Sequence, residues 1–225
     1  MKNPISALLF LLSVPCTAGA ATLATYAFAN GPATPPSTLG VTAGVIAYGP
    51  GLGTPQTSAA TFGTSGANAL GLFTNATTPT TVPAAVSANS FFTFTLTPDP
   101  GTSVAFTGLS LWANYSGDDR SANELALQID SGSGFQTIGT VVMNVTGAAS
   151  PGKFYNIPIS GLDPVEGPAT FRVVMYDSAG VTWSSFTRMD DIAVSGTIIP
   201  EPSSCLIACA ASCLPLLRRN RRSRR

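Results

Sequence analysis

The side chains that most often carry enzymatic chemistry are scarce in this sequence. Its 225 residues include no histidine, which removes the usual general base at neutral pH and the commonest transition-metal ligand. All four cysteines lie near the two ends, at Cys16, Cys205, Cys209 and Cys213, so residues 21–199 cannot form a disulfide. The composition therefore predicts a protein that is not an enzyme and whose core is stabilised by packing.

Carboxylates are the remaining groups that could do chemistry. Glycosidases use two of them across a cleft, and the middle of this chain has only two glutamates, Glu124 and Glu166, each in a polar context. The sequence has no serine-centred nucleophile motif to set beside them. A polysaccharide hydrolase is therefore an alternative function and not the leading one.

Two adjacent acid pairs, Asp118-Asp119 and Asp190-Asp191, are candidate calcium ligands, because calcium prefers carboxylate and carbonyl oxygens. Neither pair has the spacing of an EF-hand loop. Solvated turns explain the same residues without a metal, as does pairing of Asp190 with Arg188 or Arg172. Calcium is the one cofactor that the sequence suggests, and otherwise no cofactor is expected.

Trp112 and Trp183 are candidate sugar-stacking residues, as in carbohydrate-binding jelly rolls. Trp112 lies out of phase with Leu109 and Leu111, so its ring is expected to point away from the core. Ordinary core packing is the competing interpretation. A carbohydrate-binding jelly-roll module is therefore the second candidate function.

The charge of the chain is unevenly distributed. Between Ala21 and Ile199, four basic residues stand against ten acidic ones, a net charge of about −6. Such a domain repels phosphate backbones, so no nucleic-acid partner is expected. Most of the basic residues lie at the C-terminus, at Arg218, Arg219, Arg221, Arg222, Arg224 and Arg225.

The middle of the chain has the pattern of β-strands. Phe92, Phe94 and Leu96 alternate with threonines, and Leu125, Leu127 and Ile129 alternate with Glu124, Gln128 and Asp130. Short runs like these, separated by turn residues, predict an all-β, antiparallel β-sandwich over residues 21–197. Residues 29–89 are expected to be loop-rich, and no segment shows a convincing helical period.

The N-terminal 20 residues have the features of a signal peptide. Lys2 precedes an apolar run that is too short for a lasting membrane span. Ala18-Gly19-Ala20 forms a site for signal peptidase, which makes Ala21 the expected first residue of the mature protein. A lipoprotein leader cut before Cys16 is the alternative, and Pro15 disfavours it.

The C-terminal residues 198–225 have three parts in a fixed order. Pro200-Glu201-Pro202 comes first, and the two prolines are expected to keep this segment extended and to prevent regular sheet pairing. A hydrophobic helix follows at residues 203–217, with an apolar run of about 20 Å that is short for a bilayer core of about 30 Å. The arginine-rich tail, residues 218–225, is expected to stay in the cytoplasm.

This ordered triple resembles the PEP-CTERM sorting signal, with Ile199 where the family usually has valine. The resemblance covers about the last 28 residues. It implies export in a Gram-negative bacterium, cleavage by an exosortase in the inner membrane, and delivery to the cell surface or extracellular space. It also implies association with exopolysaccharide or biofilm matrix. A plain tail anchor is the competing interpretation.

The stretch from Phe171 to Gly196 is similar to the last strands of the jelly-roll ectodomains found in such proteins. There a final strand follows an Asp-Asp or Asp-Asn pair and leads directly into the sorting signal, as Asp190-Asp191 does here. The leading prediction is therefore a non-catalytic surface or matrix protein with a jelly-roll-like domain. It would be processed by signal peptidase and an exosortase and held only transiently in the inner membrane.

Overall fold

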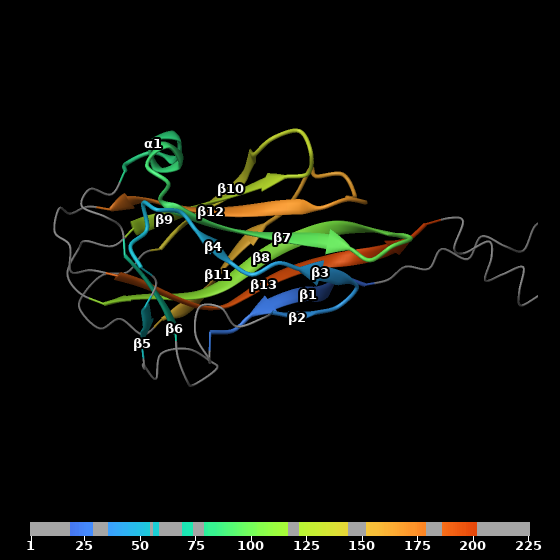
Figure 1. Ribbon diagram of the computed structural model, residues 1–225, viewed down its shortest axis with the longest axis horizontal. Helices are drawn as coiled ribbons and strands as arrows, with labels where there is room; N and C mark the ends of the chain where they lie inside the picture. The colour runs from blue at the N-terminus through green and yellow to red at the C-terminus, as the bar shows by residue number, and fades with distance from the viewer. Residues whose placement is uncertain are drawn as a thin grey trace, which may run out of the picture.

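The computed structural model describes residues 19–28, 36–54, 56–58, 69–73, 79–116, 122–143, 152–178 and 186–201. These residues form two antiparallel β-sheets packed face to face, with one short helix on the outside (Figure 1). The predicted all-β sandwich is thus confirmed. No helix in these ranges is long and apolar enough to cross a bilayer, and the expected helix at 203–217 lies outside them, as does most of the leader.

The two sheets draw their strands from the whole length of the chain. Sheet A consists of β1 (Ala21–Tyr26), β2 (Ser37–Thr38), β5 (Gln56–Ser58), β6 (Ala69–Phe73), β8 (Thr102–Ser116), β11 (Lys153–Pro158) and β13 (Phe186–Pro200). Sheet B consists of β3 (Val41–Ala43), β4 (Ala47–Tyr48), β7 (Phe91–Pro98), β9 (Ala122–Asp130), β10 (Gln136–Val142) and β12 (Ala169–Ser178). Helix α1 (Val82–Ser87) precedes β7.

Strand β13 is the centre of sheet A. It pairs with β8 along one side, and with β6 and then β1 along the other, so the order is β11-β8-β13-β1-β2. Sheet B has the order β10-β9-β12-β7-β3, with β4 also on β7. All these pairs are antiparallel.

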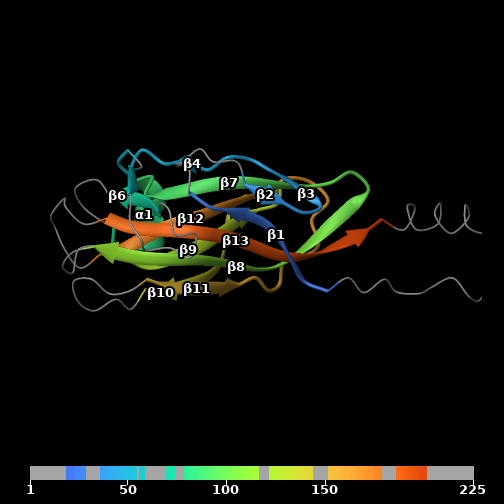
Figure 2. The same cartoon turned by 90° about the horizontal axis from the view of Figure 1, so that it is seen from below.

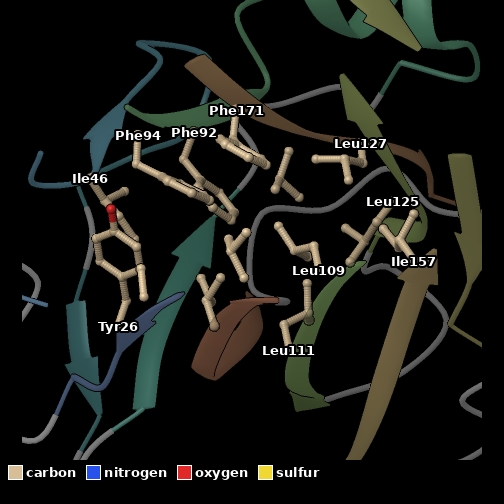
Figure 3. Packing of buried hydrophobic residues seen from close by; sticks show 14 of the residues in the cluster. Tyr26, Ile46, Phe92, Phe94, Leu109, Leu111, Leu125, Leu127, Ile157 and Phe171 are labelled. Carbon is tan, nitrogen blue, oxygen red and sulfur yellow. The ribbon is translucent and has the colours of Figure 1, made fainter. Parts of the chain in front are cut away.

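The core lies between the sheets and is built from the residues whose alternation marked the strands. Phe92, Phe94 and Leu96 are buried along β7, whereas the residues between them are half-buried. The ring of Phe171 stacks on Phe94 with centroids 5.1 Å apart, and meets the edge of Phe106 at 5.0 Å. Figure 3 shows Phe94 and Phe171 of sheet B in one cluster with Leu109 and Leu111 of β8 in sheet A. The aromatic rings therefore join the two sheets.

Two local features interrupt the regular strand pattern. Helix α1 was not predicted, because its six residues are too few to show a helical period. Thr81 caps it by accepting from Ala84 N–H at 3.4 Å, and Ala85 packs on the outer face of sheet B. The run around Gly108 is one strand, β8, whose register shifts between Phe106 and Gly108.

Pro200 is itself paired in sheet A, in contrast to the expectation that the prolines prevent sheet pairing. It pairs with Thr102 at the end of β13, and the N–H of Glu201 donates to Gly101 O at 3.0 Å. Alternate residues of a strand direct their N–H groups to opposite sides, so the nitrogen of Pro200 faces away from β8. Within the described chain, the pairing of β13 with β1 has already ended at Gly196. The missing N–H therefore costs the ladder no hydrogen bond.

The two ends of the described chain lie at the same end of the sandwich, here called the tail pole. Ala21 pairs with Gly196 in β13, close to where β13 ends at Pro200. Figures 1 and 2 show β1 beginning and β13 ending on the same side. The opposite end, called the far pole, contains the start of β13 and α1. The described chain therefore enters and leaves the sandwich at the same pole.

Phe171→Ala is predicted to lower the free energy of unfolding by about 3–5 kcal/mol, because Phe171 is fully buried between two aromatic neighbours. Val45→Ala is the control: Val45 is 60% exposed, and its truncation should change stability by no more than about 0.5 kcal/mol. Urea unfolding of the 21–201 domain measures both. Equal effects of the two substitutions would contradict the described core.

Candidate functional site

The outer face of sheet A carries two rows of small, mostly hydroxyl-bearing residues that run across its strands. Each row follows from the register, because directly paired residues point to the same side of an antiparallel sheet. We call these rows the hydroxyl face. They consist of Asn156, Ser110, Ala193, Thr25 and Ser37 in one, and of Pro158, Gly108, Ser195 and Thr22 in the other. All are exposed or half-buried, and none is charged.

Two aromatic residues border the hydroxyl face on the side of the far pole. Phe154 in β11 pairs directly with Trp112 in β8. Phe154 is 47% exposed, whereas Trp112 keeps only 5% of its surface in solvent. Trp112 does point outward, because Leu111 and Ala113 on either side face the core. Gly152 lies so close to its indole that a Cβ there would overlap the ring.

The exposed aromatic surface at this border thus belongs to Phe154, with Trp112 beside it. Sequence reasoning missed Phe154, since only the pairing of two strands 42 positions apart brings it next to Trp112. The alternation of exposed and buried residues in β11 was the available signal. Trp183, the other expected stacking residue, lies outside the described residues.

Asp190 completes the row that contains Phe154 and Trp112, and it is fully buried. Its Oδ1 accepts hydrogen bonds from the backbone N–H of Phe28 at 3.2 Å and of Asp191 at 2.9 Å. The register of β13 shifts directly after it, and Asp191 has a left-handed φ of 47°. Asp190 therefore fixes a β-bulge and ties the chain after β1 to β13.

The hydrogen bonds of Asp190 do not test the calcium hypothesis, which stays a prediction. Oδ1 of Asp190 already serves two backbone donors, and no three potential metal-ligating side chains gather within the described ranges. Asp118 and Asp119 are not among the described residues. Pairing of Asp190 with Arg172 is wrong, because the two lie on the outer faces of different sheets.

The outer face of sheet B is occupied by a second cluster, centred on Arg172. Its guanidinium lies 3.5 Å from the ring centre of Phe135 and 4.5 Å from that of Phe91. Its Nη1 donates to Gln128 Oε1 at 3.3 Å, and Gln128 in turn donates to Thr137. Burial lowers the pKa of Arg172, against the raising effect of Asp130. The guanidinium of Arg172 is thus already held by two aromatic rings and by the side-chain amide of Gln128. These contacts indicate that Arg172 stabilises the fold.

A pocket of about 360 Å³ opens at the tail pole, between the turn after β9 and the loop before β12. Asp130 shapes the turn by accepting from the N–H groups of Gly132 and Gly134 at 2.8 and 2.9 Å. The pocket is lined by Ser131, Ser133, Gln136, Gly161, Leu162, Asp163, Pro164, Val165, Glu166 and Gly167. Its acidic side chains, Asp163 and Glu166, are both exposed.

The two glutamates considered for glycosidase chemistry lie far apart. Glu166 lines the pocket beside the turn that follows β9, whereas Glu124 lies near the start of β9 and pairs with Val142. Six residues of strand separate Glu124 from Asp130, or about 20 Å at about 3.3 Å per residue. Catalytic carboxyl pairs in glycosidases are about 5–10 Å apart. These two residues therefore cannot act as such a pair.

Comparison with known proteins finds no matching family model and no matching curated protein. Solved β-sandwich structures are similar at low identity. A Clostridium thermocellum xylanase fragment with CBM22-1 and GH10 modules, complexed with xylohexaose, is 11% identical with a TM-score of 0.41. The match covers 77% of this chain but only 28% of that one.

Two smaller domains match over most of their own length. A xylan-binding domain from CBM 22 is 13% identical with a TM-score of 0.39, over 82% of this chain and 97% of that one. The K1 cleaved adhesin domain of Lys-gingipain from Porphyromonas gingivalis W83 is 12% identical with a TM-score of 0.40, over 78% and 97%. At these identities and TM-scores, the similarities identify no ligand for this chain.

Asp191→Asn is predicted to stabilise the domain at pH 7. Burial, and then the charge of Asp190, raise the pKa of Asp191 in the folded state, so its ionised form destabilises the fold at neutral pH. Asparagine removes the charge and tolerates the left-handed backbone. The melting temperature should rise at pH 7, and the gain should vanish below about pH 4, where the aspartate is protonated in both states.

Asp191→Ala is the matched control, because it removes the same charge but places an unfavourable residue at a positive φ. The melting temperature of Asp191→Ala at pH 7 should rise less than that of Asp191→Asn. A destabilised Asp191→Asn variant would show that the carboxylate contributes an interaction stronger than its burial cost.

Proposed function

We propose that this chain is a non-catalytic domain of the cell surface or extracellular matrix that binds a neutral polysaccharide on the hydroxyl face. The observation that carries this proposal is Phe154, an exposed aromatic ring at the border of two uncharged rows. A sugar ring has an apolar face that packs on an aromatic side chain and hydroxyls that bond to polar ones. Phe154 supplies the first kind of contact, and Asn156, Ser110 and Thr25 supply the second.

The absence of charge in both rows sets the class of ligand. Anionic polymers would find no cation among these residues, and they would also be repelled by the acidic middle of the chain. A neutral polymer needs only the hydroxyl and amide groups that the rows present. Catalysis is not part of the proposal, because Glu124 and Glu166 are too far apart to act together.

Export and processing by an exosortase are the second part of the proposal, and the geometry of the tail pole supports them. The expected first mature residue, Ala21, begins β1, and Pro200 of the sorting motif ends β13, at the same pole. If the ends were at opposite poles, the 15 residues of β13 would hold them about 50 Å apart. With both ends at one pole, the leader and the tail can reach the same membrane.

Phe154→Ala is predicted to weaken binding to the exopolysaccharide of the producing strain by at least about tenfold, or about 1.4 kcal/mol. The side chain is half exposed, so its removal should leave the fold intact. Affinity electrophoresis of the 21–201 domain, or a glycan array of neutral polysaccharides, measures the change. Val45→Ala removes an exposed apolar group from the region between β3 and β4 and should bind like the wild type.

If Phe154→Ala binds the polysaccharide as the wild type does, the hydroxyl face is not the binding surface.

The proposed sorting of the chain is tested separately in the native host. Replacing Pro200-Glu201-Pro202 with alanines should leave the uncut chain in the inner membrane, whereas Ser160→Ala, at an exposed loop residue outside the sorting signal, should be processed normally. Surface delivery of the triple-alanine variant would argue against the sorting motif.

A further inference from the structure

We infer that the pocket at the tail pole binds one sugar unit of the neutral polysaccharide proposed for the hydroxyl face. The identity of the ligand rests on the proposed function, but the pocket is a second site on a different part of the surface. It lies between the turn after β9 and the loop that joins β11 to β12, and its volume is about 360 Å³. Pockets that hold small ligands have volumes of about 300–1,000 Å³, so this one has room for a small molecule.

The loop on one side of the pocket is fixed to sheet A at two points. Ile159 N–H donates to Thr107 O at 3.0 Å. Val165 and Val104 exchange two backbone hydrogen bonds, each of 2.9 Å. Val165 is buried, and Leu162, between the two points, packs against the core. The loop therefore has a defined position before any ligand binds, and its ordering costs little free energy on binding.

The turn on the other side of the pocket is held by Asp130, which accepts from the N–H groups of Gly132 and Gly134. Nε2 of Gln136 donates to Ser133 Oγ at 3.4 Å, so these two lining side chains lie next to each other. A hydroxyl and an amide can each donate and accept hydrogen bonds, as the hydroxyls of a sugar also do. This side of the pocket therefore offers polar partners from a fixed turn.

The chemical character of the lining favours a ligand rich in hydroxyls. Asp163 and Glu166 supply carboxylates, which when ionised accept from hydroxyl donors more strongly than neutral acceptors do. Leu162 and Pro164 supply apolar surface for the C–H groups of a ring. The residues that line the pocket include no basic side chain, so an anionic ligand would be repelled. A sugar unit has both the hydroxyl donors and the apolar ring face that this lining would contact.

The pocket lies close to one end of the hydroxyl face. Pro158 is the end residue of the row that also contains Gly108, and Gly161 of the pocket follows it by three residues. Three residues span at most about 10 Å, at about 3.3–3.6 Å per residue. One polysaccharide can therefore lie on the row and place a unit in the pocket. Because the rows are uncharged, the unit expected in the pocket is neutral.

Isothermal titration calorimetry of the full-length protein in detergent tests the inference. The probe is the neutral fraction of short oligosaccharides released from the exopolysaccharide of the producing strain by partial acid hydrolysis. The double variant Asp163→Asn, Glu166→Gln should bind them at least about tenfold more weakly than the wild type, because amides replace two ionised acceptors. The melting temperature of the double variant should not fall, since both side chains are exposed.

Glu124→Gln is the control, because it removes a carboxylate near the opposite end of β9 and leaves the pocket unchanged. It should bind the oligosaccharides like the wild type. No binding by the wild type, or equal affinities of the wild type and the double variant, would overturn the inference. The proposed function would still stand if Phe154→Ala weakens binding of the intact polysaccharide. If only the double variant weakens binding, the hydroxyl face is wrong and the pocket is supported.

The dependence on ionic strength distinguishes a neutral sugar from a cation. Binding of an uncharged ligand should be the same in about 0.1 M and about 1 M sodium chloride, whereas attraction of a cation by two exposed carboxylates is screened by salt. Oligosaccharide binding that is lost at high salt would show that the pocket selects a cation. Binding of calcium chloride alone that the double variant abolishes would show the same. Either result would overturn the inference.

Discussion

The fold depends on the position of β13, which pairs on both sides within sheet A. Its inward residues Met189, Ile192 and Val194 are fully buried, and its ladder with β8 runs the whole length of the sandwich. Strand β1 pairs with its other side, so the N-terminal strand of the described chain is held in the sheet by the C-terminal strand. This long-range closure ties both expected targeting segments to one folded unit.

Much of the core could be predicted from the sequence, and much of the candidate surface could not. The alternation in β7 and β9 placed Phe94 and Leu127 inside, because period-two patterns report directly on a half-buried strand. The pairing of Phe154 with Trp112 depends on register between distant strands, which no local pattern specifies. The same limit applies to Arg172, whose partners come from three other segments.

The residues that departed from expectation do so for identifiable physical reasons. Trp112 points outward as its phase indicated, yet it is buried, since the backbone at Gly152 covers its ring. Asp190 is buried because a β-bulge needs a local acceptor for the backbone donors that it leaves unpaired. Pro200 joins the ladder because only its solvent-side N–H is missing.

The proposed binding surface and the proposed membrane attachment are compatible in space. Ten residues of β8 separate Thr102, at the tail pole, from Trp112, at the aromatic border. At about 3.3 Å per residue, the border lies about 33 Å from the end where the tail leaves the sheet. A row of the hydroxyl face crosses five strands, or about 19 Å at about 4.8 Å per strand, at right angles to that direction. A polysaccharide lying along such a row would run parallel to the membrane without touching it, so the domain could engage the matrix before its tail is removed.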